Sequence, residues 1–77
     1  MTTMDFITEI ADILGMPAHT LTPETDLTAI PAWDSVAWLS SLVLIDEKLG
    51  AAVRPEMVSG ARTLQDILQA VAHKLES

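Results

Sequence analysis

Residues 34–50 read DSVAWLSSLVLIDEKLG, a stretch that opens with two helix-capping residues and closes with a glycine. Asp and Ser are both favoured at a helix N-cap, and Gly is favoured just beyond the last helical turn. The stretch therefore predicts a helix that starts at Asp34 or Ser35 and ends near Leu49, with Gly50 as its stop. No part of the chain alternates apolar and polar residues as a half-buried strand would.

This helix carries more apolar side chains than packing into a small bundle requires. On a helical wheel, one stripe about 60° wide is expected to face the core and consists of Trp38, Leu42, Ile45 and Leu49. A second apolar group lies on the neighbouring arc and consists of Val36, Leu39 and Val43. Because one stripe is enough for packing, we interpret the second group as a docking face for partner proteins. The pattern leaves open the alternative that these three residues belong to the core, and it does not place Leu44.

Helices are also predicted on both sides of this stretch. Residues 3–14 and 63–75 each gather their apolar side chains on one arc, and each starts at the Thr-x-x-Asp spacing of a capping box. A short third helix is expected at residues 55–59, which begin with proline and precede a glycine. Residues 16–33 contain three prolines and form a long connection. The predicted fold is all-α, a small four-helix bundle of three main helices and one short third helix, with a long loop between the first two.

The length and charge of the chain restrict its class. Its 77 residues are expected to form a single domain, residues 1–77. Eleven Asp and Glu against four Lys and Arg give a net charge of −7, which argues against nucleic acid and anionic membranes and favours basic protein partners. No apolar run reaches the roughly 20 residues that span a bilayer, and the N-terminus does not resemble a signal peptide. We expect a soluble, cytoplasmic and monomeric protein.

Residues with catalytic or metal-binding chemistry are sparse. The chain has no cysteine, and its two histidines, His19 and His73, lie far apart in the sequence and are expected on the surface, so we predict no metal site. A minimal serine hydrolase built on Ser35, His19 and an aspartate is compatible with the composition. However, the glycine pattern of a nucleophile elbow is missing, and so short a chain leaves little room for a buried pocket. We expect no enzymatic activity and no catalytic residue.

Residues 34–36, Asp-Ser-Val, resemble the signature of the acyl carrier and peptidyl carrier proteins. That signature is Asp-Ser followed by an aliphatic residue at the start of the second helix of a four-helix bundle. Three more segments resemble the family in the same order, namely residues 22–27 in the loop, residues 49–53 at the exit of the second helix and residues 62–66 at the start of the fourth. The resemblance covers nearly the whole chain.

The resemblance implies a covalent cofactor. A phosphopantetheinyl transferase would move 4′-phosphopantetheine from coenzyme A onto the hydroxyl of Ser35, and the thiol at the end of this arm would hold an acyl or aminoacyl group as a thioester. The carrier would pass that group from a loading enzyme to a downstream transferase in fatty acid or secondary metabolite biosynthesis. Asp34 would help to present the serine, or a metal ion, to the phosphopantetheinyl transferase. The residues themselves fit a phosphodiester, because the N–H groups and dipole at a helix start attract anions.

The helix at residues 34–50 departs from the family in its charge. Many carriers are densely acidic along their second helix, whereas the first three turns here contain Ala37, Ser40 and Ser41. This pattern is closer to specialised stand-alone carriers, including some aminoacyl carriers. We expect partner enzymes to contact the apolar docking face and the carboxylates near the helix end, that is Val36, Leu39, Val43, Asp46 and Glu47. The alternative hypothesis is a small acidic helical interaction module in which Ser35 is only a helix cap.

Overall fold

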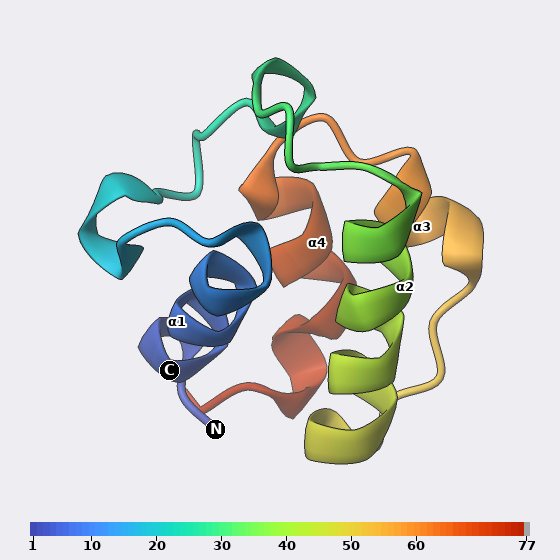
Figure 1. Ribbon diagram of the computed structural model, residues 1–77. Helices are drawn as coiled ribbons and strands as arrows, with labels where there is room; N and C mark the ends of the chain where they lie inside the picture. The colour runs from blue at the N-terminus through green and yellow to red at the C-terminus, as the bar shows by residue number, and fades with distance from the viewer. Residues whose placement is uncertain (77) are drawn as a thin grey trace.

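The computed structural model describes residues 1–76, and within this range the chain forms helices without strands (Figure 1). The four α-helices are α1 (Thr3–Leu14), α2 (Ser35–Leu44), α3 (Pro55–Ser59) and α4 (Leu64–Val71). Single 3-10 turns lie at Ala18–Thr20, Leu27–Ala29 and Ala72–Lys74, and a π-helical turn at Ile45–Leu49 extends α2. The predicted all-α four-helix bundle, with a long loop between its first two helices, is confirmed.

One hydrophobic core joins the four helices. In it α1 packs against α2, α2 against α3, and α3 against α4. Its fully buried large apolar side chains are Phe6, Ile10, Leu27, Ile45, Val58, Leu64, Ile67 and Val71. Burial of each such side chain contributes about 1.5–3 kcal/mol before the entropy of ordering is subtracted. Since the chain contains no cysteine, this cluster rather than a disulfide holds the bundle together.

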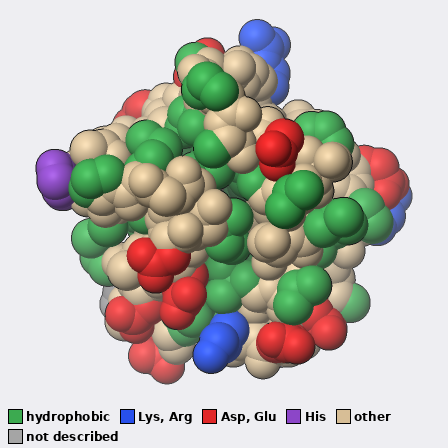
Figure 2. Space-filling model, viewed as in Figure 1, with side chains coloured by type: hydrophobic (Ala, Val, Ile, Leu, Met, Phe, Trp, Pro, Cys, Tyr) green, Lys and Arg blue, Asp and Glu red, His purple; other side chains and the backbone are tan. Residues whose placement is uncertain are grey.

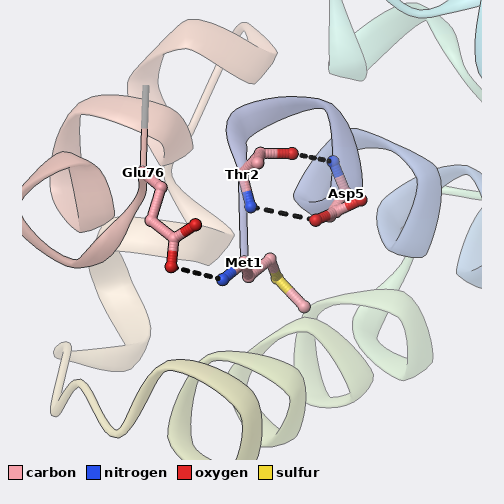
Figure 3. A network of polar contacts seen from close by, with 4 residues as sticks. All are labelled: Met1, Thr2, Asp5 and Glu76. Atoms are coloured by element: carbon pink, nitrogen blue, oxygen red, sulfur yellow. Dashed lines mark hydrogen bonds and ion pairs between the residues drawn. The ribbon is translucent and has the colours of Figure 1, made fainter.

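The two ends of the described chain are joined, as Figure 3 shows. Thr2 Oγ1 accepts a hydrogen bond from the Asp5 N–H (3.1 Å), and the Asp5 carboxylate accepts one from the Thr2 N–H (3.0 Å), which completes the predicted capping box of α1. The Glu76 N–H donates to the Met1 carbonyl (3.1 Å), and the Met1 ammonium lies 3.6 Å from the Glu76 carboxylate. An ion pair this exposed contributes little, so backbone bonds and the capping box fix this end of the bundle.

The core face of α2 is rotated away from the predicted stripe. Only Ile45 of that stripe is fully buried, and the partly buried members are Trp38, Leu42 and Leu49. The small side chains of Ala37 and Ser41 are buried instead, which allows the backbone of α2 to approach its neighbours closely. The Ser41 hydroxyl is satisfied there, because it donates a hydrogen bond to the Ala37 carbonyl oxygen (2.8 Å).

The helix predicted at residues 34–49 ends in a π-helical turn at Ile45–Leu49, which the sequence pattern did not indicate. This turn is wider than an α-helical turn, so a wheel drawn at about 100° per residue loses its register there. Leu44, which the prediction did not place, lies three residues after Ser41 on the face of α2 that buries Ala37 and Ser41, and it is itself buried. Gly50 ends the turn with φ of +62°, a left-handed conformation that favours glycine, and the predicted stop is therefore confirmed.

The long connection between α1 and α2 is fastened to the start of α4. The N–H of Leu64 donates to the Thr25 carbonyl (3.1 Å). The next N–H, that of Gln65, donates to the Pro23 carbonyl (2.8 Å). These bonds satisfy two donors that a helix start leaves free. At the far end of the connection Trp33 is buried in the core, so the chain reaches the start of α2 at a defined place.

The start of α4 also makes the fold sensitive to acid. The Asp66 carboxylate accepts hydrogen bonds from the N–H groups of Arg62 (3.0 Å) and Thr63 (3.2 Å). These bonds, with that from Arg62 the stronger influence, lower the pKa of the Asp66 carboxyl. Hydrogen bonds lower the pKa of Asp5 and Asp26 as well. A carboxyl with a lowered folded-state pKa stabilises the fold above its unfolded pKa of about 4, and this contribution is lost as the pH falls through the folded pKa.

We expect Asp66→Asn to lower the free energy of unfolding at pH 7 and to flatten its loss on acidification, because the amide does not ionise. Urea unfolding of both chains at neutral and acidic pH measures this difference. Asp12→Asn is the matched control, since the Asp12 side chain lies exposed on α1 and makes no hydrogen bond within the described range 1–76. The same pH dependence in Asp66→Asn and the wild type would contradict the expectation.

Candidate functional site

Ser35 is the first residue of α2, and Asp34 before it is the N-cap. The Asp34 carboxylate accepts a hydrogen bond from the Ala37 N–H (3.1 Å), and the backbone carbonyl of Asp34 accepts one from the Trp38 N–H (3.0 Å). The cap is therefore supplied by the aspartate. The Ser35 side chain is exposed, and its hydroxyl bonds to no residue of the described chain. This arrangement leaves the hydroxyl accessible to a reacting group.

The start of α2 also suits a phosphate. The backbone N–H groups of Ser35 and Val36 have no hydrogen-bond partner among residues 1–76, because the first residues of a helix lack a preceding turn to bond with. These free donors and the positive end of the helix dipole attract an anion. The adjacent Asp34 carboxylate is committed to the Ala37 N–H, which offsets part of its repulsion.

Two open hollows flank α2 and show which element faces each of its sides. One has a volume of about 380 Å³ and is lined by Ile13, Ala32, Asp34, Val36, Ala37 and Ser40. The other has a volume of about 280 Å³ and is lined by Leu42, Asp46, Ala51, Ala52, Val53 and Pro55. The Ala37 and Ser40 side of α2 therefore faces the end of α1, and the Leu42 side faces the segment that leads into α3.

The outer surface of α2 carries the second apolar group. Val36 is 69% exposed, Leu39 63% and Val43 53%. The alternative that these residues belong to the core is therefore wrong, and we call the three of them the apolar crest. Figure 2 shows hydrophobic side chains gathered over α2 on the face toward the viewer. Asp46 and Glu47 are exposed at the far end of the same helix, as expected.

The other candidate groups do not assemble into a site. His19 and His73 are both exposed, as predicted. Within residues 1–76 no three His, Asp or Glu side chains are grouped so as to hold a metal ion. In the same range, no helix is both long and apolar enough to cross a membrane.

One feature of Trp38 could not be read from the sequence pattern. The indole Nε1 of this residue is buried and has no hydrogen-bond partner within the described chain. A buried donor left unpaired costs about 1–3 kcal/mol. The helical wheel places Trp38 beside the core, but it does not show whether a carbonyl lies opposite its N–H.

A family model described as a phosphopantetheine attachment site matches residues 5–71. The chain belongs to this family. Its cofactor is 4′-phosphopantetheine, bound covalently, and the chain is a phosphopantetheine-carrying protein. None of the curated proteins compared with it matches significantly.

Membership of the phosphopantetheine-binding family agrees with the composition and geometry of this carrier. The cofactor brings a thiol to a chain that has no cysteine of its own. The exposed hydroxyl and the free N–H groups at the start of α2 fit the phosphodiester end of the arm. Carriers of this family work in general with transferases and synthetic enzymes.

Proposed function

We propose that Ser35 carries the phosphopantetheine arm and that the chain shuttles an acyl or aminoacyl thioester between enzymes of a biosynthetic pathway. The observation that carries this proposal is the division of roles at the start of α2. Asp34 caps the helix, and the Ser35 hydroxyl is left exposed and unbonded at its positive end. A serine that served only as the cap would accept the bond that Asp34 accepts, so this geometry disfavours the plain interaction module.

The other serines of the described chain fit the role less well. Ser41 is fully buried, and its hydroxyl is bonded to the Ala37 carbonyl. Ser40 is partly buried in the interior of α2, where the helix offers no free N–H group. Ser59 is exposed but ends α3, where the carbonyl end of the dipole repels a phosphate. Ser35 alone among these four combines exposure with free backbone donors.

The attachment reaction transfers one phosphoryl group. A bond forms between Ser35 Oγ and the phosphorus of the phosphopantetheine, and the pyrophosphate bond of coenzyme A breaks. Adenosine 3′,5′-bisphosphate leaves, and the hydroxyl proton passes to a base of the transferase. This chain would present the hydroxyl and offer the free N–H groups of Ser35 and Val36 to the phosphate, while the partner enzymes would perform the catalysis. The attached thiol supplies the thioester chemistry.

The surface around Ser35 favours basic partners with an apolar contact area. We propose that the phosphopantetheinyl transferase, a loading enzyme and a downstream transferase all dock on the apolar crest. Exposed apolar groups clustered beside a reactive position are typical of interaction sites. The carboxylates of Asp34, Asp46 and Glu47 lie at the two ends of α2 and are exposed. Together with the net charge of −7, they attract a basic enzyme surface.

This arrangement predicts how salt affects docking. We expect the association rate with the loading enzyme to fall with salt, because the Debye length shrinks from about 10 Å at 0.1 M to about 3 Å at 1 M. The dissociation rate should change little, since the crest itself contains no charge and rim charges act mainly on association. Glu47→Lys should slow association. The wild-type chain should bind tightly without the additional carboxylate that Ser40→Glu would place beside the crest.

Stopped-flow binding to the loading enzyme at low and high salt measures both rates. Glu24→Lys is the charge-matched control, because Glu24 is exposed in the long connection rather than on α2. A dissociation rate that rises steeply with salt would show that charge pairs, not the apolar crest, hold the complex.

Intact-mass measurement tests the carrier function itself. The purified chain is incubated with coenzyme A and a broad-specificity phosphopantetheinyl transferase. We expect a mass gain of one phosphopantetheine and no ester hydrolysis by the modified chain alone. An unchanged mass with an active transferase would favour the interaction module, and steady ester turnover would favour a hydrolase.

A further inference from the structure

Nε1 of Trp38 is the only buried side-chain nitrogen or oxygen without a hydrogen-bond partner in residues 1–76. The ring packs against the core and is partly buried, while the N–H itself is covered. Buried donors nearly always have a partner in folded proteins. This donor therefore points to an acceptor that the described chain does not itself supply.

The position of Trp38 suggests where that acceptor comes from. On α2, side chains three or four residues apart are neighbours on the helix surface. Trp38 is three residues after Ser35 and four before Leu42, so it lies between them. Leu42 lines the hollow between α2 and the segment that leads into α3. Trp38 is not part of that lining, but a group attached to Ser35 that lies back along this side of α2 passes Trp38 before it reaches Leu42.

We propose that the Trp38 N–H donates a hydrogen bond to an amide carbonyl of the phosphopantetheine arm and positions the arm on the α3 side of α2. This inference rests on the proposed attachment at Ser35. The arm contains two amides, whose carbonyl oxygens are good acceptors, and no residue of the described chain competes for this N–H. Trp38 is a positioning residue and takes no part in bond making.

The unmodified chain is suited to this arrangement. Its indole N–H is desolvated and unpaired, so a new hydrogen bond there replaces no existing one. The side chains that cover the N–H must move aside when the carbonyl approaches.

The ¹H–¹⁵N signal of the Trp38 indole tests the inference directly. The chain has two tryptophans, so Trp33→Phe assigns the two indole signals. On modification with coenzyme A and the transferase, we expect the Trp38 signal to move downfield and its exchange with water to slow. Ser35→Ala in the same mixture is the control, and its indole signals should not change.

Trp38→Phe removes the N–H and keeps an aromatic ring. We expect intact mass to show normal modification of this variant. The ¹⁵N-labelled amides of its arm should be flexible, with order parameters below about 0.6. The same amides should be more ordered on the wild-type chain. Because the indole signal is measured on the wild type, the test stands even where the variant folds poorly.

Each outcome decides a different proposal. A mass gain with an unmoved Trp38 indole signal overturns this inference and leaves the carrier function intact. The inference is also overturned if the Trp38 N–H is already hydrogen-bonded to water before modification and its signal stays the same afterwards. Absence of the mass gain on the wild-type chain overturns the attachment at Ser35 and this inference with it.

Discussion

Ser35→Ala should abolish the mass gain of one phosphopantetheine that the wild-type chain shows with coenzyme A and a transferase. The substitution removes the hydroxyl that attacks phosphorus, and no other serine of the described chain combines exposure with free backbone N–H groups. We expect complete loss rather than a reduced rate, because methyl offers no nucleophile. Intact mass of the full chain after prolonged incubation measures the result.

Two sets of controls separate this loss from unfolding. Because Asp34 provides the cap, Ser35→Ala should change the free energy of unfolding by no more than about 0.5 kcal/mol. Asp34→Ala should cost about 1 kcal/mol, the usual value for a lost N-cap. Ser40→Ala and Ser59→Ala should still be modified. A phosphopantetheine found on Ser35→Ala would place the attachment at another residue.

Leu39→Ala should weaken binding to the loading enzyme by about tenfold, or about 1.4 kcal/mol. Leu39 is central in the apolar crest and 63% exposed, so its truncation removes contact area from a partner but little from the core. The free energy of unfolding should therefore stay within about 0.5 kcal/mol of the wild type. Titration of the loading enzyme and urea unfolding of the same preparation measure the two effects.

Met4→Ala is the matched control for Leu39→Ala. Met4 is 65% exposed, like Leu39, but lies on α1 away from the crest, so its truncation should leave binding unchanged. Ile67→Ala is the reference for a core residue. Ile67 is fully buried, so its truncation should lower the free energy of unfolding by about 2–5 kcal/mol. If Leu39→Ala loses stability in that range with normal binding, the assignment of the crest to partners is wrong.

Helix starts could be predicted from the sequence because their signals are local, whereas the helix expected to run to residue 75 leaves the α-helical form after Val71 and continues as a 3-10 turn at Ala72–Lys74. The capping boxes at Thr2 and Thr63 act within three residues of each helix start, and both form as predicted. Gly15 and Gly50 adopt the left-handed conformation expected at helix ends. The exposed apolar crest was also predictable, because an excess of apolar side chains over what packing needs is visible on a helical wheel.

The core face of α2 could not be predicted in the same way. It depends on how closely neighbouring helices approach, and the small Ala37 and Ser41 allow the close contact that turns this face inward. The π-helical turn at Ile45–Leu49 shifts the register that the wheel assumes. Whether the Trp38 N–H has a partner depends on tertiary contacts that no single helix encodes. The same holds for the division of roles between Asp34 and Ser35, since either residue suits an N-cap.

The bonds from the start of α4 to the loop at Pro23 and Thr25 have a consequence for how the chain folds during translation. These partners lie about 40 residues apart, and the loop precedes α2 while α4 follows it. During translation the loop therefore lacks these two anchors until the start of α4 has left the ribosome. The connection that leads into α2 is therefore fixed in place only after residues on both sides of α2 have been synthesised.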